Sequence, residues 1–299
     1  MCVAMKTNNS SGVFHVLAVA ALLSLAWFVF LKISGTHASL AESNFQSNIV
    51  RVDDYFFGPE KTAALIGTSI TGRLLPEYFQ EQGVAVANLG LDGCIPRTGI
   101  ELVLKKNALP KTVFVETTAT PREPRGNDTE ILAFIGDITF KLSRWFPLLR
   151  ADTRPSSILY SRMKKKNDAR QIPPPSSEGV SEPKKIVPDP AYASVPGAEQ
   201  MRIVERATAD LQNALAALSA SGVRVVLMRL PVGGAPLRRA GDEPDVTDRL
   251  AAALSLDVLD VANSLHERGI PVAFSDGTHM IAPSAREASK VICERLAKK

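Results

Sequence analysis

The chain contains few of the residues that build disulfide frameworks and metal sites. It has three cysteines, at positions 2, 94 and 293, and four histidines among its 299 residues. The cysteines are too few and too scattered for a disulfide framework or a metal site. Cys94 and Cys293 either form a pair in an oxidising compartment or remain small buried hydrophobic residues. His15, His37 and His266 have no candidate ligand partners, so we expect neither a metal nor another cofactor.

The chain also lacks a strong excess of one charge. Its formal net charge is +4 and its pI is near 9.0, and part of this comes from a local basic stretch that begins at residues 162–166. An evenly basic surface, as in many nucleic-acid-binding proteins, is not predicted. With 45% hydrophobic residues, the chain has material for one substantial core, which favours a single domain with appendages.

Long hydrophobic runs are limited to one, from Val13 to Leu31, which is interrupted only by His15 and Ser24. A helix of this length crosses a hydrocarbon core of about 30 Å. The sequence therefore predicts an N-terminal tail at residues 1–12, a transmembrane anchor at 13–33 and a linker at 34–59. A cleaved signal peptide is the alternative, because residues 36–38 loosely resemble a cleavage site, although signal peptides have shorter apolar cores of about 7–15 residues.

The orientation of this anchor is weakly marked. Lys6 precedes the apolar run and Lys32 follows it, so the positive-inside rule gives little bias. We expect a short tail inside the cell and the folded domain outside the cytoplasm, in the periplasm.

Short apolar segments alternate with helical patterns over residues 60–299. The strand-like segments lie at 61–67, 84–88, 112–115, 223–230 and 256–261, and the helical patterns lie at 71–82, 98–107, 199–222 and 283–296. This alternation predicts an α/β domain in which a parallel sheet is covered by helices on both faces, a three-layer arrangement.

The alternation is interrupted by an insertion at about residues 121–196. A helix that starts at Asn127 or Asp128 and runs to Leu142 is predicted there, followed by a polar, lysine- and proline-rich segment, Met163 to Pro190, that we expect to be mobile. The helix and the basic residues either rest on an anionic membrane surface or form a core-packed helix and a solvated linker.

Three separate segments carry residues suited to acyl chemistry. Ser69 follows the first strand, Gly93 follows the second, and Asp276 and His279 stand three residues apart before the last helix. A serine hydroxyl becomes nucleophilic when an imidazole takes its proton, and a carboxylate orients that imidazole. Because the carboxyl ends of parallel strands share one edge, Ser69 and His279 are predicted to meet there, with Asp276 orienting His279. The backbone N–H groups of Ser69 and Gly93 are candidate donors to an oxyanion.

In these segments the chain resembles the SGNH hydrolases, also called the GDSL esterase/lipase superfamily. The resemblance covers roughly residues 60–120 and 200–299 and implies an SGNH/flavodoxin-like sheet with Ser69, Asp276 and His279 as the catalytic residues. The oxyanion hole is then expected from Ser69, Gly93 and a side chain after the third strand. The family places an asparagine there and an aspartate before the serine, whereas this chain has Thr118 and Thr68 at the matching positions.

Other readings of these residues stay open. Ser69 is also a suitable helix N-cap, His279 a suitable structural histidine, Asp276 a suitable turn cap and Gly93 a suitable residue for a tight bend. Arg97 and Arg122 follow strands at the expected active edge and are candidates for binding an anionic substrate.

The resemblance implies a membrane-anchored serine esterase or O-acyltransferase that works through an acyl-enzyme. Its expected substrate is an ester, for example an acylated envelope polysaccharide. A transferase with one membrane span needs a multispanning partner to deliver the acyl group. Because the family's asparagine is missing, the alternative is an inactive scaffold or binding protein of an envelope glycan assembly system.

Overall fold

The computed structural model describes residues 10–118, 121–168, 170–171, 197–233, 237 and 242–298. The strands are β1 (Ala63–Gly67), β2 (Val86–Gly90), β3 (Thr112–Glu116), β4 (Arg224–Arg229) and β5 (Asp257–Asp260). They form one parallel sheet in the order β2-β1-β3-β4-β5. The predicted α/β class and parallel sheet are therefore confirmed, with strand limits close to those expected from the sequence.

The α-helices that precede or accompany the first three strands are α1 (Ser10–Ser34), α2 (Asn44–Phe57), α3 (Pro76–Gln80) and α4 (Pro96–Leu104). The region after β3 holds α5 (Gly126–Phe134), α6 (Ile138–Ser143) and α7 (Pro155–Asp168). The C-terminal part adds α9 (Gly197–Ala220), α10 (Val246–Leu254), α11 (Val261–Glu267) and α12 (Ala282–Ala297). Short 3₁₀ turns are η1 (Thr71–Arg73), η2 (Pro147–Leu149) and η3 (Ala151–Thr153).

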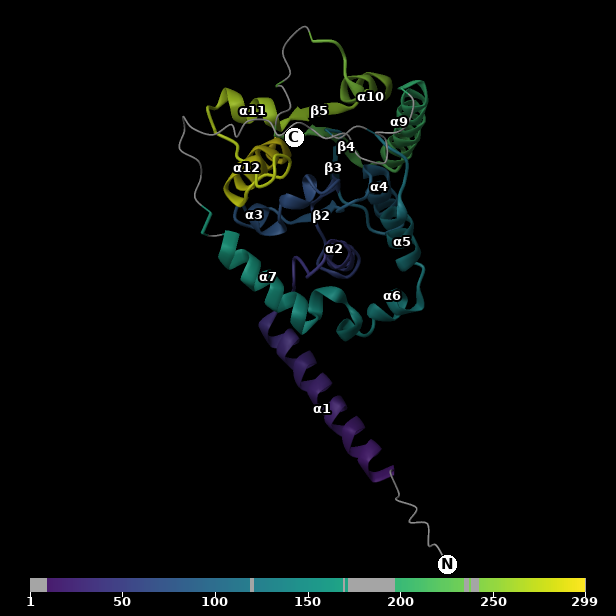
Figure 1. The fold of residues 1–299 in the computed structure, drawn as a ribbon, viewed down its shortest axis with the longest axis vertical. Helices are drawn as coiled ribbons and strands as arrows, with labels where there is room; N and C mark the ends of the chain where they lie inside the picture. Colours follow the sequence, from purple (N-terminus) through teal and green to yellow (C-terminus); the bar gives the residue numbers. More distant parts are fainter. Residues whose placement is uncertain are drawn as a thin grey trace, which may run out of the picture.

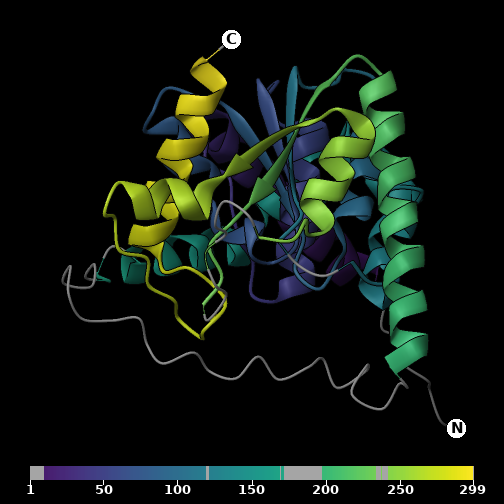
Figure 2. The ribbon, with the colours of Figure 1, turned by 90° about the horizontal axis from the view of Figure 1, so that it is seen from above.

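Helices pack against both faces of the sheet because its central strands alternate their side chains between two apolar clusters. Ile66 of β1 lies in the cluster beneath α2, α4 and α9, whereas Leu65 lies in the cluster beneath α3, α11 and α12. Figure 2 shows the sheet between α12 on one side and α9 on the other. Every residue of β1, β2 and β3 is buried, as expected for strands covered on both faces.

The segment predicted as a linker at 34–59 contains a helix that belongs to the core. In α2, Ile49, Val52 and Tyr55 are buried, and the helix contacts β2 at the edge of the sheet. Ser43 caps its N-terminus by accepting a hydrogen bond from the backbone N–H of Gln46. The apolar residues Phe45, Ile49, Val52 and Phe56 of α2 follow a helical spacing, a signal in the sequence that the linker prediction missed.

The region 121–196 also differs from its prediction. The helix expected to run to Leu142 is divided into α5 and α6, because Gly136 and Asp137 interrupt it and Asp137 caps α6. Met163 to Asp168, expected to be mobile, form the end of α7. The rest of that expected segment lies almost entirely outside the described residues.

The apolar N-terminal helix projects away from the domain (Figure 1). Within α1, Gly12–Ser34 is long and apolar enough to cross a membrane, and only 6% of its most apolar window is buried. Its last turns contact the domain, where Leu31 is buried and the Trp27 Nε1–H donates to the backbone oxygen of Thr153 at 2.9 Å. One apolar N-terminal helix is therefore present, attached to the domain at its C-terminal end.

The two described cysteines, Cys94 and Cys293, are unpaired and buried. Burial raises the pKa of the Cys94 thiol to about 12 and that of Cys293 to about 11. Of the two readings left open by the sequence, the structure favours small buried thiols.

Candidate active site

The candidate nucleophile lies in a tight turn at the carboxyl end of β1. β1 ends at Gly67, residues 68–70 turn, and η1 follows directly, so Ser69 is placed at the edge of the sheet rather than within a helix. Ser69 is half-buried. The N-cap alternative is not supported, since the residue that caps η1 is Ile70 and no side-chain cap bond is made there.

Ser69, His279 and Asp276 form one hydrogen-bonded chain. The Ser69 Oγ lies 2.8 Å from the His279 Nε2, and the His279 Nδ1 lies 2.6 Å from the Asp276 Oδ2. The serine and histidine are 210 residues apart in sequence. The structure therefore brings together the three residues that the sequence predicted, in the connectivity of a catalytic triad.

Asp276 is held ionised by its surroundings. Its Oδ1 accepts backbone hydrogen bonds from Thr278 at 3.0 Å and His279 at 2.8 Å, while its Oδ2 faces the imidazole. Partial burial raises the pKa of Asp276, but the hydrogen bonds from His279 and Thr278 outweigh burial and lower the pKa to about 2. The carboxylate is thus suited to orient His279 and to stabilise it when it carries a proton.

The loop that carries Asp276 and His279 is closed on itself. A bridge pairs Phe274 with Met280, and the Ser275 N–H donates to the His279 oxygen at 2.8 Å. Gly277 has a φ of 81°, which favours glycine, and its backbone oxygen is so close to Gly233 that an added Cβ on Gly233 would lie 2.1 Å away. The loop after β4 therefore supports the histidine loop by direct backbone contact.

Glu116, the last residue of β3, holds the turn at residues 68–70, which we call the nucleophile turn because it carries the candidate nucleophile Ser69. It is fully buried, and its Oε2 accepts hydrogen bonds from the Thr68 N–H at 2.8 Å, the Thr68 hydroxyl at 2.9 Å and the Thr71 hydroxyl at 2.9 Å. The sequence reasoning missed this residue. A glutamate that ends an otherwise apolar strand was the signal that could have identified it, since a buried carboxylate needs partners.

The Gly93 loop contains the second expected oxyanion donor. Gly93 has a φ of 74° and is exposed, and an added Cβ would lie 2.7 Å from the Asn127 Nδ2. Among the described residues, neither the Gly93 nor the Ser69 backbone N–H is paired with an acceptor. Both groups are therefore free to donate to a ligand.

Thr118, the expected replacement for the family's asparagine, is engaged elsewhere. Its hydroxyl oxygen accepts a hydrogen bond from the Leu230 N–H at 2.8 Å, which ties the end of β3 to the end of β4. The amide beside Gly93 belongs to Asn127, at the start of α5, which donates one hydrogen to the Asp92 oxygen at 3.3 Å. Because an amide nitrogen has two hydrogens, the second remains available. The sequence treated Asn127 only as a helix cap.

The two candidate substrate-binding arginines differ in their surroundings. Arg97 is paired with Glu101 at 2.9 Å and Asp210 at 3.0 Å, so its charge is already compensated. Arg122 donates to the Gly93 oxygen at 2.8 Å and therefore lies at the candidate oxyanion loop. The structure brings Arg122, but not Arg97, to Gly93.

Two side chains of α2 hydrogen-bond to the same loop. The Asn48 side chain donates to the Asp92 oxygen at 2.9 Å and accepts from the Asp92 N–H at 2.7 Å. Buried Arg51 donates to the backbone oxygens of Gly90 at 2.7 Å and Gly72 at 3.3 Å, which links the Gly93 loop to the nucleophile turn. These residues lay in the expected linker, so sequence reasoning assigned them no role.

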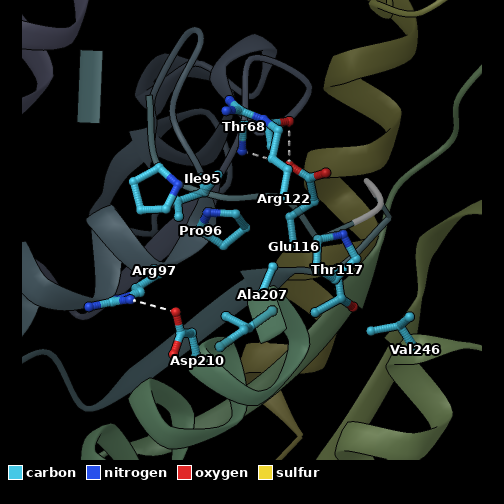
Figure 3. Close-up of a pocket in the computed structure, with 13 residues that line it drawn as sticks. Thr68, Ile95, Pro96, Arg97, Glu116, Thr117, Arg122, Ala207, Asp210 and Val246 are labelled. Carbon is cyan, nitrogen blue, oxygen red and sulfur yellow. Dashed lines mark hydrogen bonds and ion pairs between the residues drawn. The ribbon is translucent and has the colours of Figure 1, made fainter. Parts of the chain in front are cut away.

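A small apolar cavity of about 30 Å³ lies beside the nucleophile turn (Figure 3). Thr68, the residue before the serine, and buried Glu116 line it, together with Ile95, Ala207 and Val246. In Figure 3, the Arg97–Asp210 pair lies at the rim, away from Thr68.

A second cavity, of about 130 Å³, is more polar and is lined by residues that follow the turn in sequence. Gly72 and Arg73, which follow the nucleophile turn, line it with Asp92 and Ser275. The Arg73 Nε is buried and has no hydrogen-bond partner among the described residues. Thr68 before Ser69 and Gly72 after it therefore line two different cavities, a small apolar one and a larger polar one.

Comparison with protein-family models, with curated proteins and with solved structures gives no match.

Proposed function

We propose that the protein is a membrane-anchored serine esterase or O-acyltransferase of SGNH type. The observation that carries the proposal is the hydrogen-bonded chain from Ser69 through His279 to Asp276. Two further features agree with it: the five-stranded parallel sheet has the strand order of flavodoxin-like folds, and the candidate residues lie at its carboxyl edge, where ligands bind in open α/β sheets.

The proposed reaction begins with attack of the Ser69 Oγ on the carbonyl carbon of an ester, while the His279 Nε2 takes the serine proton. The resulting oxyanion is stabilised by the N–H groups of Ser69 and Gly93 and by the second amide hydrogen of Asn127. His279 then gives its proton to the leaving alkoxide oxygen, which leaves an acyl group on Ser69. Water or an acceptor hydroxyl attacks the carbonyl carbon of this acyl-enzyme and loses its proton to His279. The bond from that carbon to the Ser69 Oγ then breaks, His279 returns the proton to the Oγ, and the free acid or the new ester is released.

The inactive scaffold was considered because no asparagine follows β3. Asn127 would supply the missing amide donor from another element. The amide comes from the start of α5 and reaches the Gly93 loop through the packing of α5 on α4. Arg122, which donates to the Gly93 oxygen, fixes the same loop.

The cavities support a small acyl group on a polar carrier. The apolar cavity beside Thr68 suits a short acyl chain, and the polar cavity bordered by Arg73 and Ser275 suits a hydroxyl-rich group such as a sugar. An acylated envelope glycan has both parts. We place the domain outside the cytoplasm, with α1 retained as an anchor because Leu31 and Trp27 attach it to the domain. A transferase would receive its acyl group from a multispanning partner.

The test is labelling of the full chain, purified in detergent, with a fluorophosphonate probe. We expect labelling in the wild type, none in Ser69→Ala, and wild-type labelling in the control Ser221→Ala, whose serine lies at the end of α9. Absence of labelling in well-folded wild-type protein would favour the scaffold alternative. Release of free acid from acetylated glycans without an added acceptor would separate the esterase from the transferase.

A further inference from the structure

A group of exposed apolar side chains lies on the segment from α6 to η2. Trp145 is 75% exposed, Ile138 is 66% exposed and Phe146 is 58% exposed. Leu142, Leu148 and Leu149 are also exposed on this segment. We call residues 138–149 the apolar collar. So many large apolar residues exposed within twelve positions form a patch that soluble surfaces rarely carry without a partner.

The collar lies where α1 meets the domain. α1 contacts η2, and the Trp27 Nε1–H donates to the Thr153 oxygen just after the collar. In Figure 1, α6 and the turn after it form the end of the domain from which α1 projects. The collar is therefore level with the last turns of α1.

This placement fixes the collar relative to a bilayer. A hydrocarbon core of about 30 Å needs roughly 20 helical residues, and Gly12–Ser34 supplies 23. A bilayer that covers this helix must therefore extend to about Trp27–Leu31, which is the depth at which α1 contacts η2. Tryptophan and other aromatic residues are favoured at this depth, as are basic residues whose chains reach the headgroups.

The charges of the collar also suit contact with lipid headgroups. Within the collar the chain has Lys141 and Arg144 and no acidic residue; Asp137, which caps α6, directly precedes it. The Arg144 guanidinium lies over the Trp145 ring, 5.9 Å from its centroid. Apolar side chains beside cations suit an interface with anionic headgroups, whereas a protein partner of the same chemistry would have to fit between the domain and the membrane.

We propose that the apolar collar is inserted in the membrane interface beside α1, so that the domain rests on the lipid surface instead of hanging from a free tether. The contact holds the domain at a fixed height and tilt. The proposal does not depend on the esterase chemistry or on the side of the membrane.

The chain itself provides the probes for a test, because Trp27 and Trp145 are its only tryptophans. The full chain is reconstituted in vesicles of phosphatidylcholine and phosphatidylglycerol whose acyl chains carry bromine, which quenches nearby tryptophan. Trp27→Phe leaves Trp145 as the reporter, and Trp145→Phe leaves Trp27. The double phenylalanine variant with Met201→Trp places a reporter on α9, at the other end of the domain, where residue 201 is 65% exposed.

We expect the brominated lipid to quench Trp145 by a fraction close to that for Trp27, and aqueous iodide to quench neither. The reporter at position 201 should show the opposite behaviour. If Trp27→Phe weakens folding, the difference between the wild type and Trp145→Phe reports Trp145 without that variant. Quenching of Trp145 by iodide would place the collar in water, and protection from both quenchers would show that protein covers it; each result would overturn the proposal.

Discussion

The proposed oxyanion site has two candidate side-chain donors, Asn127 and Thr118, which make different contacts in the structure. Asn127 faces Gly93, whereas Thr118 accepts from the Leu230 N–H. If Asn127 is an oxyanion donor, Asn127→Ala should lower turnover of a small ester by about 100- to 1,000-fold with little change in KM. Thr118→Val should mainly lower thermal stability, because it leaves the Leu230 N–H without its partner, and should have a smaller effect on turnover.

Steady-state kinetics and thermal unfolding of the two variants check this assignment. A larger loss of turnover in Thr118→Val than in Asn127→Ala would return the donor role to Thr118. Retained fluorophosphonate labelling in both variants would show that the nucleophile itself is unaffected.

Asp53 provides a pH-dependent test of the packing beneath the site. It is buried in α2, and its Oδ2 accepts from the Ala151 N–H at 2.7 Å. Burial, with a further contribution from nearby Asp152, raises the pKa of Asp53 to about 7. The folded state therefore binds a proton that the unfolded state releases near pH 4, so this group makes stability fall as pH rises from about 4 to about 7.

Asp53→Asn should remove this loss, because the amide stays neutral and still accepts from Ala151. We expect it to raise the free energy of unfolding at pH 8 by up to about 4 kcal/mol and to have little effect at pH 4. Thermal unfolding of wild type and variant at the two pH values measures the difference. A variant that is less stable than the wild type at pH 8 would contradict the raised pKa of Asp53.

At the scale of elements, the site is supported by loops that meet backbone to backbone. An alanine Cβ at Gly233 would lie 2.1 Å from the Gly277 oxygen, so Gly233→Ala must displace the Asp276–His279 loop. We expect a large loss of turnover with the global fold retained. Gly197→Ala is the matched control, since nothing lies within 4 Å of its Cβ and it starts helix α9. Circular dichroism and ester turnover of both variants test this, and unchanged turnover in Gly233→Ala would show that the loop adapts.

The sequence predicted those elements whose signal is local. Buried strands such as Ala63–Gly67 appear as short apolar runs, and Ser69 and the Asp276–His279 pair each stand beside such a local signal, a strand end or the start of the last helix. The helix expected at 71–82 is divided because Pro76 lacks the N–H that a continuous helix would need, and Pro76 instead starts α3. The proline makes that interruption visible in the sequence.

The contacts that α2 and α5 make with the candidate site could not be predicted from local sequence signals. Arg51 reaches Gly90 and Gly72, and Asn127 reaches Gly93, only after distant segments pack together. Such contacts leave no spacing pattern in one sequence. A motif-based prediction therefore identifies Ser69, Asp276 and His279, which the structure brings together, and misses the residues that hold them in place.

At the scale of the whole molecule, the membrane side on which the domain lies is open to a direct test. We expect alkaline phosphatase fused after the C-terminus to be active, because that enzyme needs an oxidising compartment outside the cytoplasm. A green fluorescent protein fusion at the same position should be dark after export in the unfolded state. Fluorescence together with inactive phosphatase would place the domain in the cytoplasm.

The separation of 210 residues between the serine and its histidine also has a consequence during synthesis. A ribosome that has finished β1 has made Ser69, but His279 is made only shortly before the last helix. On the proposed mechanism, the growing polypeptide would therefore have no acyl-transfer activity until its final segment has folded against the sheet.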